Sequence, residues 1–289
     1  MMDSIFDVPF ALGMMRLPDY PALAEPSALA DWISRQVEAG FTLFDHADIY
    51  GAGECETRFG EALKAAPALK ANLQVITKAD IVTAQADRSP FSVKHYDTTR
   101  AYLMQQAEQS LSRLNLERID VFLIHRPDPL MPAEETARAL EDLVAQGKVG
   151  QVGVSNFLPE QWRWLQANLN QKLVCNQVQL SLTVTDMLVS GQLEAHLHDG
   201  LKLLAWSPLA GGQWPEALSQ RLAQLAEEKG VAREAIALAW LKAIPGMPLP
   251  VVGTCNPERL AACAQVTDVQ LNRPEWYALW EAARGHRVP

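Results

Sequence analysis

The sequence contains no long apolar run and no excess of basic charge. None of its apolar runs approaches the roughly 20 residues that a helix needs to cross a bilayer. The first residues, Met1-Met-Asp-Ser-Ile-Phe-Asp, place acids where a secretory signal has bases, and no apolar stretch follows them. The formal net charge is −9 and no Lys/Arg cluster interrupts it, which argues against a nucleic-acid-binding surface. These absences predict a cytoplasmic protein that binds neither nucleic acid nor a membrane.

Paired cysteine motifs are also lacking. The chain contains four cysteines and no CxxC pair; they are Cys55, Cys175, Cys255 and Cys263. Widely scattered cysteines of this kind are typical of reduced thiols in a cytoplasmic protein rather than of a disulfide framework or a structural zinc site.

Short apolar runs alternate with amphipathic stretches along the 289 residues, which are 48% hydrophobic. The expected strands are Phe10–Arg16, Phe41–Asp45, Leu73–Lys78, Ile119–His125, Gln151–Val154, Val174–Val178, Lys202–Trp206 and Leu249–Gly253. The expected helices are Ser27–Ala39, Glu56–Ala65, Thr98–Leu114, Ala133–Gln146, Pro159–Ala167, Asp186–His196, Pro215–Lys229 and Arg233–Ala243. Ser27 and Asp97 are the expected caps of the first and third helices. This alternation predicts an α/β fold, a (β/α)₈ TIM barrel, with residues 1–289 as a single domain.

A doubly wound open sheet shares this alternation and is the structural alternative. It is disfavoured because no glycine-rich phosphate turn follows the first strand: Gly51-Ala-Gly53 lacks the third glycine and lies in the loop after Tyr50. Long loops after barrel strands usually form the substrate pocket. We therefore expect substrate specificity to reside in the segments Ile81–Tyr96, Arg126–Pro132 and Gly212–Pro215, and in the C-terminal tail.

Polar side chains end three consecutive expected strands. Asp45, Lys78 and His125 lie there on the same strand faces as the apolar residues two positions earlier. A barrel core requires branched apolar side chains at these positions, whereas catalytic groups occupy the rim at the carboxyl ends of the strands. Tyr50 follows Asp45 by five residues and can fold back over the same rim. The pattern predicts an active site.

These four residues form a set suited to protonating an oxyanion. Tyrosine has a reference pKa of about 10, and a nearby ammonium such as that of Lys78 lowers it and aids proton exchange at neutral pH. Asp45 supplies the counter-charge for Lys78. His125 can hydrogen-bond a substrate oxygen. An oxyanion of this kind forms when hydride adds to a carbonyl group.

The motifs around these residues resemble the aldo-keto reductase family. They occur in family order from about residue 8 to about residue 285, and none is specific alone. They are Asp45-His-Ala-Asp-Ile-Tyr50-Gly, Ile76-Thr-Lys78, Leu123-Ile-His125-Arg-Pro, Gly147-Lys-Val-Gly-Gln-Val-Gly-Val-Ser155-Asn156-Phe, Asn176-Gln177-Val-Gln and Ala205-Trp206-Ser207-Pro208-Leu209. The resemblance is greatest to a bacterial cytoplasmic branch with a histidine after the catalytic aspartate.

The resemblance implies NADPH-dependent reduction of an aldehyde or ketone on a TIM barrel without a Rossmann domain. Tyr50 would be the proton donor, Lys78 would lower its pKa, Asp45 would pair with Lys78, and His125 would orient the carbonyl. Ser155, Asn156 and Gln177 match residues that hydrogen-bond the nicotinamide carboxamide, and Trp206 replaces the usual Tyr or Phe that stacks on the ring. The loop over the pyrophosphate is matched by Ser207, Pro208, Leu209 and Gly211.

The adenosine end departs from the family pattern. Thr254 and Arg259 match the hydroxyl and the arginine around the 2′-phosphate, but Gly253 replaces the first base and the Glu-Asn pair is missing. Because arginine can bind a phosphate through two hydrogen bonds, Arg259 is expected to select NADP over NAD. An NADH-preferring reductase is the alternative.

Other interpretations remain beside this one. A metal centre at Asp45, His46 and Asp48 is disfavoured, because strand alternation turns His46 to the other face and no third ligand has suitable spacing. A metal-dependent barrel isomerase is therefore a distant rival, and no metal is expected. A nucleotide-sensing binding subunit is the other rival, since some relatives of this fold keep the four residues while serving mainly as partners. The expected partner is a small carbonyl substrate, and a monomer is the default.

Overall fold

The computed structural model describes residues 5–84 and 93–288. Residues 1–4 lie outside this part, and with them the start of the chain, where no secretory signal is predicted. Residues 85–92, the middle of the expected specificity segment Ile81–Tyr96, also lie outside it. No helix among the described residues is both long and apolar enough to cross a membrane.

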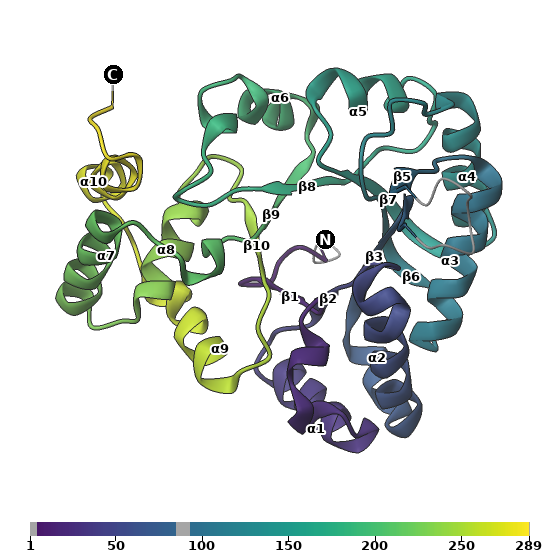
Figure 1. Ribbon diagram of the computed structural model, residues 1–289, viewed down its shortest axis with the longest axis horizontal. Helices are drawn as coiled ribbons and strands as arrows, with labels where there is room; N and C mark the ends of the chain where they lie inside the picture. The colour runs from purple at the N-terminus through teal and green to yellow at the C-terminus, as the bar shows by residue number, and fades with distance from the viewer. Residues whose placement is uncertain (1–4, 85–92, 289) are drawn as a thin grey trace. The chain divides into compact units, whose positions relative to one another are not determined.

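Eight strands form a closed parallel barrel, in the order β1-β10-β9-β8-β7-β6-β3-β2 (Figure 1). They are β1 Ala11–Gly13, β2 Leu43–Asp45, β3 Gln74–Ala79, β6 Ile119–Ile124, β7 Val149–Ser155, β8 Cys175–Gln179, β9 Lys202–Trp206 and β10 Leu249–Val252. Each corresponds to one of the expected strands within a few residues. The predicted (β/α)₈ TIM barrel is confirmed.

Helices follow the strands along the chain. The α-helices are α1 Pro26–Glu38, α2 Glu54–Ala65, α3 Arg100–Leu114, α4 Ala133–Ala145, α5 Pro159–Gln166, α6 Gln192–Asp199, α7 Glu216–Lys229, α8 Arg233–Lys242, α9 Pro257–Ala264 and α10 Arg273–Arg284. Short 3₁₀ helices are η1 Leu17–Asp19, η2 Pro21–Leu23, η3 Tyr50–Gly53, η4 Pro67–Asn72, η5 Asp186–Leu188, η6 Ala210–Gly212 and η7 Gln265–Asp268.

By its internal contacts the chain divides into two compact units. The N-terminal unit is Gly13–Asn176, and the C-terminal unit is Met1–Leu12 together with Gln177–Pro289. The expectation of a single domain stays a prediction. The four residues of the expected active site all belong to the N-terminal unit.

The strand register of the N-terminal unit brings the polar strand ends together. β2 pairs with β3 so that Asp45 lies opposite Ile76, and β3 pairs with β6 so that Lys78 lies opposite Leu123. Lys78 is therefore two residues further along its strand than the partner of Asp45, and His125 follows directly after β6. Helices α1 to α5 form an outer layer around these strands, each packing against the next (Figure 1).

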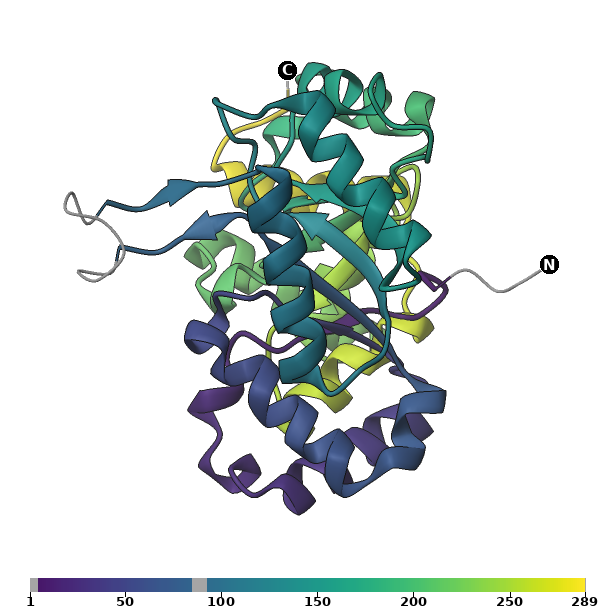
Figure 2. The same cartoon turned by 90° about the vertical axis from the view of Figure 1, so that its right-hand side faces the viewer.

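Two short strands in the segment after β3 are not suggested by the sequence. Ile81–Val82 (β4) and His95–Tyr96 (β5) form a two-stranded antiparallel sheet, with Ile81 opposite Tyr96. Figure 2 shows this pair extending away from the rest of the N-terminal unit. A pair of two-residue strands is too short to produce a recognisable alternation, so a polar loop was the natural expectation.

Three helix details differ from expectation. Helix α1 begins at Pro26 after Glu25, without a side-chain cap, so Ser27 is not its cap. Helix α3 is capped by Thr99, whose hydroxyl accepts the Tyr102 amide, while Asp97 accepts from Thr99 instead. The expected helix Asp186–His196 is split into η5 and α6, and Gly191, with φ 82°, is the N-cap residue before the second piece. Each error reflects a choice between adjacent polar or glycine residues that local sequence leaves open.

The C-terminal unit is held together by its own strand pairs and an aromatic cluster. β10 pairs with β9, with Leu249 opposite Leu204, and with β1, with Ala11 opposite Val251. Trp240 of α8 and Trp276 of α10 stack with centroids 4.7 Å apart, and each indole N–H donates to the other residue's carbonyl. These contacts explain why an amphipathic C-terminal segment carries tryptophans.

Candidate active site

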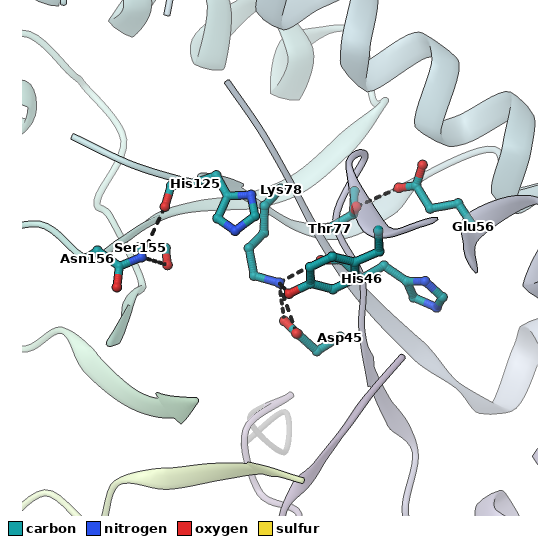
Figure 3. Close-up of polar contacts among 9 residues, drawn as sticks. Asp45, His46, Glu56, Thr77, Lys78, His125, Ser155 and Asn156 are labelled. Carbon is teal, nitrogen blue, oxygen red and sulfur yellow. Dashed lines mark hydrogen bonds and ion pairs between the residues drawn. The ribbon is translucent and has the colours of Figure 1, made fainter. Parts of the chain in front are cut away.

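The ammonium group of Lys78 is the centre of the site. It lies 2.9 Å from both carboxylate oxygens of Asp45, and it donates to the His46 carbonyl at 2.6 Å and to the Tyr50 hydroxyl at 3.2 Å. Figure 3 shows the Lys78 side chain reaching from its strand to Asp45. Lys78 is fully buried, so its charge is satisfied by these groups rather than by solvent.

Burial alone would lower the pKa of Lys78, but Asp45 and Tyr50 outweigh it and leave the pKa above its ordinary value. Lys78 is therefore a permanent cation at neutral pH. For Tyr50, burial raises the pKa and the Lys78 charge lowers it; the net pKa is above the ordinary value. The expectation that Lys78 brings the tyrosine pKa down is correct for its own contribution, but desolvation is larger. Tyr50 thus keeps its proton and is available as an acid.

A left-handed turn places Tyr50 over the strand ends. Tyr50 begins η3, and the next three residues all have positive φ: Gly51 at 58°, Ala52 at 55° and Gly53 at 94°. The Arg113 side chain packs beneath Gly53, where an added Cβ would come within 3.1 Å of it. Two glycines in the turn therefore meet real requirements, one for backbone conformation and one for close packing.

His125 lies next to Tyr50. The centroids of the two rings are 6.2 Å apart and nearly perpendicular, and the Lys78 ammonium is 5.0 Å from the centre of the Tyr50 ring. Burial, followed by the positive charges of Lys78, Arg126 and Lys94, holds the pKa of His125 well below its ordinary value. The imidazole is therefore neutral, and it can donate one hydrogen bond to a substrate oxygen without competing for its proton.

A buried carboxylate lies behind β3. Glu56, fully buried on α2, accepts from the Thr77 hydroxyl at 2.6 Å, from the Arg113 guanidinium at 2.7 Å and from Ser110 at 3.2 Å. Figure 3 shows Glu56 and Thr77 on the side of the strand away from His125. Because Thr77 precedes Lys78, this network holds the strand that carries the lysine. Glu56 is absent from the residues predicted for the site, since nothing in its helix distinguishes it from a solvated acid.

His46 and Asp48 flank the site but do not form a metal centre with it. The His46 ring packs edge-on against Phe59 at 4.7 Å, and burial lowers its pKa to about 3. Burial, helped by Glu56, raises the pKa of Asp48 to about 7. In residues 5–84 and 93–288, no group of three or more His, Cys, Asp or Glu side chains is arranged to hold a metal ion.

Ser155 and Asn156, expected to bind the nicotinamide carboxamide, follow one another at the end of β7. The Asn156 amide donates to the Ser155 hydroxyl at 2.8 Å and to the His125 carbonyl at 3.2 Å. Asn156 has φ 62°, a conformation that asparagine adopts more readily than most residues. The turn thus presents a hydroxyl and an amide beside His125, within the same unit.

The other expected cofactor residues belong to the C-terminal unit. Gln177 is buried in β8 and Trp206 ends β9 half-buried. The following loop has positive φ at Ser207 (51°) and Gly211 (66°), with Pro208 and Leu209 between them. A backbone with positive φ favours small or flexible residues, and a serine and a glycine occupy these two positions.

Thr254 and Arg259 lie around the start of α9. The Thr254 hydroxyl accepts the Asn256 amide at 3.2 Å, and Asn256 caps the helix by accepting the Arg259 amide at 3.0 Å. Arg259 is exposed in the first turn, where the helix dipole also favours an anion. A hydroxyl, a guanidinium and a helix N-terminus in one short segment are donors suited to a phosphate group.

Asp80 is a second residue of the site that is absent from the predicted set. It lies two residues after Lys78, is fully buried, and accepts the Arg126 amide on Oδ2 at 2.9 Å. The available signal was its position, because it is one more polar residue at the end of the third expected strand.

The site as a whole brings together a protonated phenol, a buried cation and a neutral imidazole within one unit. These three groups can together deliver a proton to an oxygen.

Comparison with known proteins agrees with this geometry. The model of the aldo/keto reductase family matches residues 9–284. A 6-dehydroglucose reductase of Agrobacterium fabrum is 40% identical over 280 residues, covering 96% of this chain and 94% of that protein. Oxidoreductase YdhF of Escherichia coli is 37% identical over 286 residues, covering 97% of this chain and 95% of the other.

Solved structures show the same similarity. A thermostable aldo-keto reductase in complex with the inhibitor epalrestat superposes with a TM-score of 0.80 at 28% identity, covering 95% of this chain and 94% of the other. An aldo/keto reductase of Klebsiella pneumoniae in complex with NADP and acetate has a TM-score of 0.78 at 25% identity, with 98% and 93% covered. On its sequence and its barrel alike, this chain belongs to the aldo/keto reductase family.

Proposed function

We propose that the protein is an NADP-dependent oxidoreductase that reduces an aldehyde or ketone to an alcohol, with Tyr50 as the proton donor. The observation that carries this proposal is the Lys78 ammonium, which is buried between the Asp45 carboxylate and the Tyr50 hydroxyl. A purely structural ion pair would not require a tyrosine hydroxyl and a neutral imidazole at the same strand ends. Membership of the family and the oxidoreductases among its relatives support the same activity.

In the proposed mechanism four residues of the N-terminal unit have separate roles. His125 donates a hydrogen bond to the carbonyl oxygen and orients it toward the Tyr50 hydroxyl. Bound NADPH supplies the hydride. As negative charge develops on the oxygen, Tyr50 transfers its proton there, and the Lys78 ammonium stabilises the phenolate left behind. Asp45 keeps Lys78 in place and balances its charge.

The residues present fit the cofactor that the family implies. In the N-terminal unit, Ser155 and Asn156 offer the hydroxyl and amide that a carboxamide would bind. In the C-terminal unit we assign Gln177 to the carboxamide, Trp206 to stacking, and the loop from Ser207 to Gly211 to the pyrophosphate. Thr254 and Arg259, at the start of α9, are assigned to the 2′-phosphate. The Klebsiella pneumoniae relative solved with NADP supports this choice of cofactor.

Turnover with NADPH tests the proposed function directly. We expect the purified protein to oxidise NADPH in the presence of a carbonyl compound, with no loss of rate in a chelator. The panel comprises simple aldehydes, ketones, quinones, dicarbonyls and polyhydroxylated aldehydes, the last because two relatives are named 6-dehydroglucose reductase. Tight NADPH binding without turnover on any class would favour the nucleotide-sensing subunit. A rate that the chelator abolishes would favour a metal-dependent enzyme.

Changing Arg259→Ala tests the assignment of the 2′-phosphate. We expect NADPH affinity to fall roughly 10–150-fold, the equivalent of one charge-assisted hydrogen bond of about 1.5–3 kcal/mol, while NADH affinity stays nearly unchanged. The measurement is cofactor binding by fluorescence titration. Arg273→Ala is the matched control, because Arg273 is likewise an exposed arginine in the first turn of a helix of the same unit. Equal losses for both cofactors in the Arg259 variant would contradict the assignment and favour an NADH enzyme.

A further inference from the structure

Asp80 combines an unusual backbone with complete burial. It follows the last residue of β3, has φ 127°, and its side chain is fully buried. The other non-glycine residues with positive φ in the described chain have values between 45° and 62°, in the left-handed helical region. A φ of 127° favours glycine, so holding a side chain there costs stability. A glycine at this position would remove that cost.

Two consecutive backbone amides, those of His125 and Arg126, donate hydrogen bonds to the end of β3 and to the residue that follows it. The Ala79 carbonyl accepts the His125 amide at 3.0 Å, and Oδ2 of Asp80 accepts the Arg126 amide at 2.9 Å. The carbonyl of Asp80 in turn accepts the Asp97 amide at 2.8 Å, just before α3. The carboxylate therefore substitutes for a strand partner where the β3–β6 ladder ends, and it fixes the chain on the far side of His125.

The segment of His125 and Arg126 connects β3 to Asn156, one of the residues expected to bind the nicotinamide. β3 carries Lys78, and the two hydrogen bonds accepted by Ala79 and Asp80 tie the backbone around His125 to that strand. On its other side, the His125 carbonyl accepts the side-chain amide of Asn156 at 3.2 Å. A shift of the backbone at His125 would therefore displace both the imidazole and Asn156.

Burying the Asp80 carboxylate, which accepts the hydrogen bond from the Arg126 amide, has an electrostatic cost. Oδ1 of Asp80 has no hydrogen-bond partner among residues 5–84 and 93–288. Burial raises the pKa of Asp80 well above its ordinary value; the hydrogen bond from Arg126 opposes this, and the nearby charges of Asp48 and Asp128 add to it. Backbone strain and an unsatisfied buried oxygen thus coincide at one residue. Costs of this kind persist mainly where function requires them.

We propose that Asp80 is a positioning residue, whose carboxylate holds the Arg126 amide and so fixes the His125 imidazole relative to Lys78. It acts through His125 and need not contact the substrate. The inference rests on the proposed function, because it assigns His125 the orientation of the carbonyl. It predicts that loss of the carboxylate impairs catalysis more than it impairs folding.

Three variants separate positioning from stability. Asp80→Gly removes the carboxylate and relieves the backbone, so its melting temperature should equal or exceed that of the wild type, whereas kcat/KM should fall about 10- to 100-fold. Asp80→Asn keeps an acceptor oxygen and should retain most of the activity. Asp120→Ala is the matched control, because Asp120 makes the same kind of bond, to the Val75 amide at 2.8 Å, at the opposite end of the β3–β6 pair. It should leave kcat/KM unchanged.

A double-variant cycle tests whether Asp80 acts through His125. If it does, adding Asp80→Gly to His125→Gln should cause little further loss of kcat/KM, since the group being positioned is already gone. Losses that multiply would overturn the proposal, and so would an Asp80→Gly enzyme with wild-type kcat/KM or an Asp80→Asn enzyme as impaired as Asp80→Gly.

Nuclear magnetic resonance of the imidazole tests the same role without turnover. With ¹⁵N-labelled histidine, the His125 resonances are those missing in His125→Gln. We expect Asp80→Gly to shift or broaden them and Asp80→Asn and Asp120→Ala to leave them in place. Unchanged His125 resonances in Asp80→Gly would overturn the positioning role. A wild-type protein that reduces no carbonyl would instead overturn the proposed function, while the resonances still decide the role of Asp80.

Discussion

Changing Tyr50→Phe is expected to lower the rate of carbonyl reduction by at least about 10²–10⁴-fold, the contribution typical of general acid catalysis. The substitution removes only the hydroxyl, which accepts one hydrogen bond from Lys78 at 3.2 Å. The ring keeps its packing beside His125. Folding and NADPH binding should therefore survive, and the loss should appear in kcat rather than in cofactor affinity.

The control for Tyr50→Phe is Tyr277→Phe, since Tyr277 packs on Trp276 and Trp280 in α10. That variant should keep full activity. Steady-state kinetics and cofactor titration on both proteins separate a catalytic effect from a general one. A Tyr50→Phe enzyme that binds NADPH normally and keeps near-normal kcat would show that another group supplies the proton.

The pH dependence follows from the direction of the Tyr50 pKa. Burial outweighs the Lys78 charge and holds this pKa above its ordinary value, so Tyr50 stays protonated through neutral pH. Reduction requires that proton and is favoured as long as it is present. As pH rises toward the tyrosine pKa the acid is lost, so kcat for reduction should decline only on the alkaline side.

Periodicity was sufficient to predict the barrel and the convergence of its polar strand ends. Asp45, Lys78 and His125 each interrupt a run of residues that a barrel core would keep apolar, and parallel pairing then aligns their strands. Their chemical roles are proposals, but their proximity follows from register. The same reasoning could not locate helix caps, because Asp97 and Thr99 are equally good candidates and only tertiary geometry decides between them.

Features that depend on burial could not be predicted from the sequence. The effect of the Lys78 charge on Tyr50 can be inferred from residue types, but the larger desolvation of the phenol depends on how deeply the packed turn places it. The third acceptor of the ammonium, the His46 carbonyl, belongs to the backbone and leaves no trace in the sequence. Asp80 is absent from the predicted site residues, because φ 127° and complete burial are properties of the folded chain alone.

Lys78→Met should abolish measurable reduction and also destabilise the protein. Methionine approximates the volume of the lysine stem but removes the donor to Asp45, to the His46 carbonyl and to Tyr50 at once. Asp45 then stays buried without its cation, and breaking a buried pair in this way typically costs about 3–5 kcal/mol. The expected result is a lower melting temperature together with loss of turnover, measured by thermal unfolding and by NADPH oxidation.

The double variant Asp45→Asn/Lys78→Met separates the two effects of losing Lys78. Replacing the buried carboxylate with a neutral amide removes most of the penalty for burying a charge whose cation has been lost, so the melting temperature should recover toward that of the wild type. Activity should not recover, because no cation remains to stabilise the Tyr50 phenolate as the proton leaves. Activity that returned together with stability would show that Lys78 matters only for folding. A stable but inactive double variant would assign the ammonium to the chemistry at Tyr50.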